Sequence, residues 1–206
     1  QHFLPPENAR QILQRSEGVF LTYEAFVDGC AYAQEDYVNC PSAYLCGKTT
    51  ADYVKATRRP VPDIKAFLIS HRDRLDSLDL VVGNLQVKAE MMQRLASLSG
   101  VYITSSVPHL IEISNEVCGK HRGLAFLAAH LGISREDVCA FGNADNDADM
   151  LAWAGLGIAV ANGSPACLSA ADAVTGSYWE DGVAQAFDRL LGIHPICKGE
   201  FHGTDH

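Results

Sequence analysis

The chain has 206 residues, of which 48% are hydrophobic, enough for one large domain or two small ones with a buried core. Its formal net charge of -9 argues against a general nucleic-acid binder, because a phosphate backbone requires a basic face. No apolar run approaches the roughly 18 residues of a membrane span, and no signal peptide is recognisable. We therefore expect neither nucleic acid nor membrane as a partner, and a cytoplasmic location.

The cysteine pattern supports the same view. The count is odd, the spacing is scattered, and no Cys-x-x-Cys occurs, which argues against a disulfide framework and against structural zinc. We expect reduced, mostly buried thiols. The cysteines are Cys30, Cys40, Cys46, Cys118, Cys139, Cys167 and Cys197.

The first half of the chain predicts an α+β unit with a partly antiparallel sheet. Asp28-Gly29 is a hairpin signal between two runs rich in β-forming residues, because the turn needs positive φ. Residues 39–62 are mixed, with two prolines near their end. Helical patterns cover residues 7–15, 64–71 and 89–98, and strand patterns cover 19–27, 30–33, 78–82, 101–105 and 110–113.

The second half alternates helices and short apolar strands, which predicts a parallel αβ layer. Gly132 follows the first helix in the position of a C-terminal cap. Helices are expected over 123–131, 145–154, 165–171 and 181–191, and strands over 138–141, 157–160 and 173–175. The polar tail 194–206 shows little packing signal, so we expect it to be mobile. We place the domain boundary so that residues 1–114 form one domain and residues 115–206 the other.

The segment most suggestive of chemistry runs from Gly142 to Leu151. It follows a buried strand, and sites in open α/β sheets form beyond the carboxyl ends of strands. Asp145, Asn146 and Asp147 also begin the next helix, where free amides and the helix dipole favour an anion. Helix capping alone would explain only one or two of these polar residues and leaves the others unexplained. The segment therefore predicts a site for a metal ion and a phosphate.

A calcium loop is an alternative interpretation, because Asp145, Asp147 and Asp149 alternate. It fails because Met150 stands where a glycine is needed and Leu156 where a bidentate glutamate is needed. Lys120 is the other candidate residue. A lysine just ahead of a helix N-terminus is poorly placed against the dipole, unless it faces a bound phosphate. Taken alone, however, this residue is better interpreted as an ordinary solvated lysine.

Together these segments resemble the Cof-type phosphatases of the haloacid dehalogenase-like hydrolase superfamily, over residues 7 to 191. The resemblance rests on five blocks in order. They are Lys120 with Leu124, Leu127 and 131–133; 141–147 with Met150 and Leu151; 154–160 with Asn162; Ala171, Asp172, Val174 and Thr175; and 180–184. The resemblance implies an α/β fold, with an α+β cap domain over 1–114 and the C-terminal half of a parallel-sheet core over 115–206.

The resemblance also implies roles for matched residues. Lys120 falls where the family's catalytic lysine neutralises the substrate phosphate, and Asn146 where an asparagine contacts it. Asn143 falls at a position that usually holds a metal-binding aspartate, and Asp147 where an aspartate supports the metal site. The implied cofactor is Mg²⁺, and the implied substrate is a small phosphorylated metabolite, with phosphosugars the usual class. The cap region offers candidate polar contacts, although an ordinary surface or core role is the favoured interpretation of each. They are Tyr23, Tyr32, Tyr44, His71 and Arg72.

The sequence departs from the family at several points. It contains no Asp-x-Asp-Gly-Thr segment, which supplies the nucleophile of the family's aspartyl-phosphate, and His121 replaces a common glycine. We therefore expect the chain to be the C-terminal part of a longer enzyme and inactive alone. Asn143 is a weaker ligand for a hard cation than an aspartate, which favours a second hypothesis, a degenerate protein that binds a phosphorylated ligand or a partner. A third is an interaction domain without a ligand.

Overall fold

The computed structural model describes residues 2–192, and the contacts divide the chain into two compact units between Cys118 and Gly119. We call residues up to 118 the first unit and those from 119 the second unit. The boundary expected at 114/115 would detach the last residue of strand β6 (Leu110–Asn115) from its sheet. The tail 194–206, which we expected to be mobile, lies outside the described residues.

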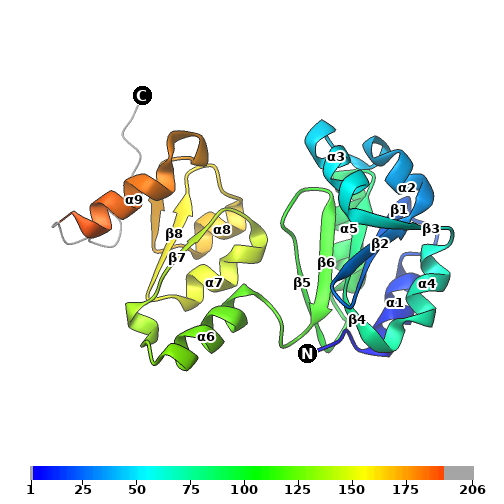
Figure 1. Ribbon diagram of the computed structural model, residues 1–206, viewed down its shortest axis with the longest axis horizontal. Helices are drawn as coiled ribbons and strands as arrows, with labels where there is room; N and C mark the ends of the chain where they lie inside the picture. The colour runs from blue at the N-terminus through cyan, green and yellow to red at the C-terminus, as the bar shows by residue number, and fades with distance from the viewer. Residues whose placement is uncertain (1, 193–206) are drawn as a thin grey trace. The chain divides into compact units, whose positions relative to one another are not determined.

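The first unit is built on a six-stranded sheet of order β3-β2-β1-β4-β6-β5 (Figure 1). The pairs are antiparallel except β2 with β3, which is parallel. The strands are β1 (Leu21–Val27), β2 (Cys30–Gln34), β3 (Arg58–Val61), β4 (Leu75–Val82), β5 (Val101–Thr104) and β6. The helices are α1 (Pro6–Arg15), α2 (Glu35–Asn39), α3 (Lys48–Thr57), α4 (Ile64–Ser70) and α5 (Leu85–Leu95).

The predicted hairpin between β1 and β2 is confirmed. Asp28 and Gly29 both have positive φ, 52° and 73°, and Val27 pairs with Cys30 across the turn. This is the conformation that matches the right-handed twist of two flanking strands. The mixed segment 39–62 contains a helix and an edge strand that the pattern did not resolve. Strand β3 carries Pro60 and pairs in parallel with β2 at the edge of the described sheet, a long-range pairing that no local pattern reveals.

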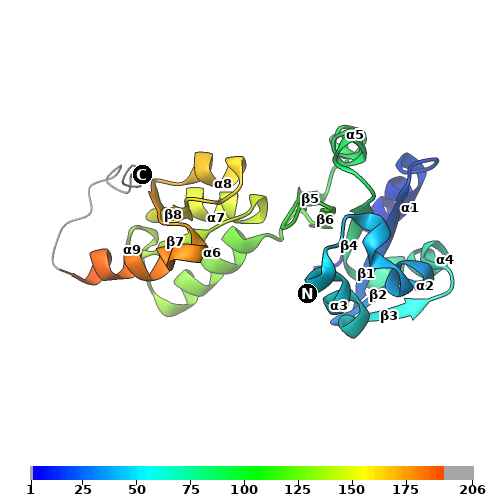
Figure 2. The same cartoon turned by 90° about the horizontal axis from the view of Figure 1, so that it is seen from above.

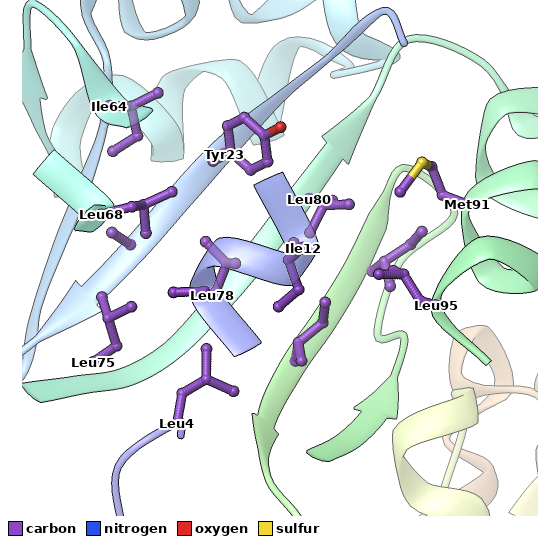
Figure 3. Packing of buried hydrophobic residues seen from close by; sticks show 14 of the residues in the cluster. Leu4, Ile12, Tyr23, Ile64, Leu68, Leu75, Leu78, Leu80, Met91 and Leu95 are labelled. Atoms are coloured by element: carbon purple, nitrogen blue, oxygen red, sulfur yellow. The ribbon is translucent and has the colours of Figure 1, made fainter. Parts of the chain in front are cut away.

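The main core of the first unit lies between one face of the sheet and helices α1, α4 and α5. Ile12 of α1, Leu68 of α4 and Met91 of α5 are fully buried against alternate residues of the strands (Figure 3). Each buried side chain of this size contributes about 1.5–3 kcal/mol. Because side chains in a strand alternate between faces, this core fixes which residues of β1, β4 and β6 point to the opposite face.

Helix α5 begins earlier than predicted, at Leu85. The reason is a cap, because the side chain of Asn84 accepts a hydrogen bond of 2.8 Å from the backbone N–H of Val87. On the opposite face of the sheet, helices α2 and α3 form a smaller cluster with Tyr37, Val54 and Val81.

The second unit has a parallel three-stranded sheet of order β7-β8-β9, as the sequence predicted. Helices α6, α7 and α8 pack on one face and α9 on the other (Figures 1 and 2). The strands are β7 (Cys139–Gly142), β8 (Leu156–Val160) and β9 (Ala173–Thr175). The helices are α6 (Lys120–Leu131), α7 (Ala148–Trp153), α8 (Pro165–Ala170) and α9 (Gly182–Leu191).

Helix α6 starts three residues before the predicted residue 123, so that Lys120 is its first residue. It ends as predicted, with Gly132 at φ 67° in the left-handed conformation. The apolar face of this helix is only partly covered within the described residues. Ala128 is buried, whereas Leu127 and Leu131 are 51% and 59% exposed.

The expectation of mostly buried thiols is wrong. Of the six described cysteines, all free, only Cys46 and Cys167 are buried, and Cys40 and Cys139 are exposed. Cys139 is exposed because it begins β7, which has no strand on its outer side among the described residues. Cys197 lies outside the described residues.

Candidate functional site

The site begins where β7 ends, at Gly142. A Cβ atom on this residue would lie 2.6 Å from Cβ of Asp147 and 3.2 Å from Cδ1 of Leu151. Only glycine therefore lets the loop fold back on the carboxyl end of its own strand. The loop then makes a 3₁₀ turn, η4 (Asp145–Asp147), before α7 begins, so the predicted helix starts three residues late.

Asp147 closes this loop. It is 3% exposed, and its Oδ2 accepts hydrogen bonds from the backbone N–H groups of Asn143, at 2.8 Å, and Ala144, at 3.1 Å. Its Oδ1 pairs with the ammonium of Lys120. The carboxylate thus fixes the loop to its own helix and to the start of α6, 27 residues earlier in the sequence.

The protonation of Asp147 follows from these contacts. Burial acts to raise the pKa of this carboxyl, but the hydrogen bonds from Lys120 and from the two backbone amides outweigh it and hold the pKa below its ordinary value. The group is therefore a carboxylate at neutral pH and keeps Lys120 in place as its counter-ion.

Lys120 combines a fixed position with access to solvent. Gly119, at φ 116°, turns the chain into α6, and Nζ of Lys120 also lies 3.4 Å from Oδ1 of Asn146. The side chain is 48% exposed. An ammonium has three N–H donors, and these two contacts use two of them. The structure thus brings Lys120, Asn146 and Asp147 together as predicted, and their roles remain predictions.

Asn143, the fourth predicted residue, lies differently. It is exposed, and its backbone carbonyl accepts a 2.9 Å hydrogen bond from the N–H of Ser164, which joins the loop to the start of α8. Both oxygens of Asp147 already accept hydrogen bonds from the protein. Among residues 2–192 no three His, Cys, Asp or Glu side chains are grouped as metal ligands. These residues do not form a magnesium site by themselves, and we assign no chemical step to a metal.

Several other residues on which the resemblance rests form hydrogen bonds that stabilise the fold of the second unit. Oδ2 of Asp172 accepts from the N–H of Gly157 at 3.0 Å, and Oδ1 of Asn162 accepts from the N–H of Tyr178 at 3.1 Å. Behind the loop, the thiol of Cys167 is buried, and burial with the nearby charges of Asp147 and Asp145 raises its pKa to about 11. This cysteine is a packed thiol and not a nucleophile.

The first unit contains a polar cluster that the sequence reasoning missed. Glu24, Asp79, Glu112 and Arg58 line a pocket of about 530 Å³. The available signal was an acid between two apolar residues in each of three strands. The five candidates named from the sequence do not line this pocket. For example, Tyr23 is 1% exposed, and its hydroxyl lies 2.6 Å from Oγ of Ser16 on the other face of the sheet.

Comparison with known proteins agrees with this architecture. The sequence model of the haloacid dehalogenase-like hydrolase family matches residues 1–187 of this chain. The chain belongs to this family. Within residues 2–192 no helix has the length and apolar character needed to cross a bilayer.

Curated relatives in this family are matched over part of their length. The chain is 42% identical over 85 residues to the 5-amino-6-(5-phospho-D-ribitylamino)uracil phosphatase YitU of Bacillus subtilis, which covers 41% of this chain and 32% of the relative. It is 38% identical over 92 residues to a phosphoglycolate phosphatase of Methanothermobacter thermautotrophicus, covering 45% of this chain and 40% of the relative. The match therefore spans about a third of the length of these relatives.

Solved structures share the fold over nearly the whole chain. A haloacid dehalogenase-like hydrolase from B. subtilis has a TM-score of 0.73 at 21% identity and covers 93% of this chain and 72% of that chain. One from Bacteroides thetaiotaomicron has a TM-score of 0.67 at 25% identity, covering 92% and 68%. A sugar phosphatase of HAD subclass IIB has a TM-score of 0.68 at 18% identity, covering 94% and 69%.

Proposed function

We propose that this chain belongs to a magnesium-dependent phosphatase that acts on small phosphorylated metabolites, with sugar phosphates as the favoured class. In this proposal the first unit is the cap and the second unit is the C-terminal half of the core. The observation that carries the proposal is the position of Lys120. Its half-exposed ammonium is held by a buried carboxylate and lies beside the amide of Asn146.

This arrangement suits a phosphoryl group. The ammonium of Lys120 would donate its remaining N–H to a phosphate oxygen, and the Nδ2 group of Asn146 would donate to a second one. Asp147 keeps the lysine charged and oriented, since moving Nζ would leave a buried carboxylate with fewer donors. Preorganised donors of this kind stabilise charge on a transferring phosphoryl group without reorganisation during the reaction.

The covalent step needs a nucleophile, which the family takes from an Asp-x-Asp-Gly-Thr segment that these 206 residues do not contain. We propose that the aspartyl-phosphate forms on a residue outside this sequence. Mg²⁺ would supply charge neutralisation there. Asn143 would offer it only an amide oxygen, so most of its ligands must also come from elsewhere.

The first test is binding of inorganic phosphate and glucose 6-phosphate to the 206-residue chain, followed by ³¹P NMR. Lys120→Met should weaken binding of both by about tenfold or more, because a hydrogen bond to a charged group contributes about 1.5–3 kcal/mol. Lys55→Met, in exposed α3, is the matched control and should leave it unchanged. Equal effects of the two variants would contradict the proposed role of Lys120.

The second candidate function is a phospho-ligand binder without catalysis. It is favoured by the exposed neutral amide of Asn143 and by the lack of a three-ligand metal group among the described residues. Release of phosphate from p-nitrophenyl phosphate by the protein that its natural gene encodes separates the two. A rate that requires Mg²⁺ and rises in Asn143→Asp supports the phosphatase. No release by either form, with phosphate binding retained, supports the binder.

A further inference from the structure

The pocket of about 530 Å³ in the first unit lies on the sheet face opposite the main core. Its floor is formed by β1, β4 and β6, and α3 and the segment before β6 supply its walls. The volume is within the roughly 300–1,000 Å³ range of small-molecule sites. All residues that line the pocket belong to the first unit, so a ligand could bind there whether or not the protein is a phosphatase.

Three carboxylates form a row across the pocket floor. Glu24 of β1 is paired in register with Asp79 of β4, and Asp79 is paired with Glu112 of β6. All three point away from the main core because their sequence neighbours point into it. Glu24 is 1% exposed and Asp79 is 6% exposed. Like charges directly opposite each other destabilise a sheet, so the row costs the fold stability.

Of the three carboxyl groups, only Glu24, at one end of the row, forms an ion pair with a described residue. Glu24 accepts from Arg58 Nη2 at 2.5 Å and from the hydroxyl of Tyr37 at 3.0 Å. Glu112 accepts at Oε1 from the hydroxyl of Ser106 at 2.9 Å, and its Oε2 is buried with no hydrogen-bond partner among the described residues. No hydrogen bond to the carboxyl of Asp79 is seen in residues 2–192.

Two residues that line the pocket thus each carry a buried polar atom with no hydrogen-bond partner among residues 2–192, and the two atoms are of opposite type. Oε2 of Glu112 is an acceptor, and Nε of Arg58 is a donor on a side chain that is only 9% exposed. Buried polar atoms in folded proteins nearly always have partners, so each such atom calls for an explanation. A ligand that offers both a donor and an acceptor would satisfy both.

The charge of the pocket decides between a neutral and a cationic ligand. Three carboxyl groups stand against one guanidinium among the lining residues, and burial lowers the pKa of His109, which keeps that ring neutral. Burial and the neighbouring carboxylates raise the pKa of Asp79, so a cation bound beside it would favour its charged form. A metal ion does not fit, because the described side chains include no group of three placed as metal ligands. The aromatic rings of Phe26 and Tyr53, which also line the pocket, suit an organic body.

We propose that this pocket binds a small amino alcohol, whose ammonium donates to Oε2 of Glu112 and to Asp79 and whose hydroxyl oxygen accepts from Nε of Arg58. The two ends of such a ligand match the two unpartnered atoms, and its charge offsets the uncompensated carboxylates. Glu24 takes no part in ligand binding, since its oxygens are already engaged.

The test is isothermal titration calorimetry of the 206-residue chain with matched pairs of probes. Glucosamine is compared with glucose and N-acetylglucosamine, and 2-amino-1-phenylethanol with 1-phenylethanol. At least one amine should bind, at least tenfold more tightly than its neutral partners. Absence of binding by both amines at 10 mM, or equal binding of amine and neutral partner, would overturn the proposal.

Variants locate the binding. Asp79→Asn and Glu112→Gln should each weaken amine binding about tenfold or more, as expected for loss of a hydrogen bond to a charged group. Glu116→Gln removes the same charge from an exposed residue that does not line the pocket, and should leave binding unchanged. Thermal unfolding monitored by circular dichroism confirms that each variant is folded. Binding that survives both pocket substitutions would place the amine elsewhere and refute the assignment.

Discussion

Replacement of Asp147 by asparagine tests how the candidate site is held together. The carboxylate accepts two backbone hydrogen bonds, of 2.8 and 3.1 Å, and pairs with Lys120. Asparagine keeps one oxygen for the amides but loses their charge assistance, a loss of about 1 kcal/mol. Because Lys120 is half exposed, its ion pair adds only about 1 kcal/mol. We expect Asp147→Asn to lower the free energy of unfolding of the second unit by about 2 kcal/mol.

The assay is urea denaturation followed by tryptophan fluorescence. Both tryptophans, Trp153 and Trp179, lie in the second unit, so the signal reports on that unit alone. Asp145→Asn is the matched control, because it removes a carboxylate from the same loop at an exposed position. It should change the free energy of unfolding by no more than about 0.5 kcal/mol.

The pH dependence gives a second readout. The folded-state pKa of Asp147 lies below its ordinary value, so its stabilisation is present above the unfolded-state pKa and is lost as pH falls through the folded-state pKa. The gap between wild type and Asp147→Asn should therefore narrow as pH is lowered from 6 to 3. A gap below 0.5 kcal/mol at pH 7, or one that widens in acid, would refute the reasoning.

Three further predictions follow from buried groups. Gly142→Ala should destabilise the second unit by about 2–3 kcal/mol in the same urea assay, because its Cβ would lie 2.6 Å from that of Asp147. Burial and neighbouring carboxylates raise the pKa of Asp79, so the wild-type protein loses stability as pH rises above the ordinary aspartate pKa. Asp79→Asn should therefore raise the thermal midpoint at pH 8, and this gain should vanish below about pH 4. Iodoacetamide at pH 8 should label Cys40 in the native protein and Cys167 only after unfolding, as peptide mass spectrometry would show.

The Asp79 prediction separates stability from binding. The same substitution that stabilises the free protein should weaken binding of an amino alcohol, because the uncompensated carboxyl that costs stability is the one that a ligand ammonium would satisfy. Such opposition between stability and function is common where a site holds charges that the fold does not pair.

Local sequence determined most of the secondary structure and the position of the main candidate loop. The hairpin at Asp28-Gly29, the cap at Gly132 and the parallel alternation of the second unit follow from backbone conformation and hydrophobic periodicity, which act over a few residues. The approach of Lys120 to Asn146 and Asp147 was predicted from a family resemblance. The reason it occurs, a buried carboxylate closing the loop over Gly142, is visible only in the fold.

Tertiary structure alone decided the rest. Strand β3 exists because β2 offers it a ladder, and Asn143 is exposed because its loop turns outward while Asp147 turns in. The row of Glu24, Asp79 and Glu112 depends on the register of three strands drawn from residues 21–115, and that register is set by core packing on the other face of the sheet. A residue's own neighbours in sequence determine which face it takes, but only long-range pairing determines which charges it meets there.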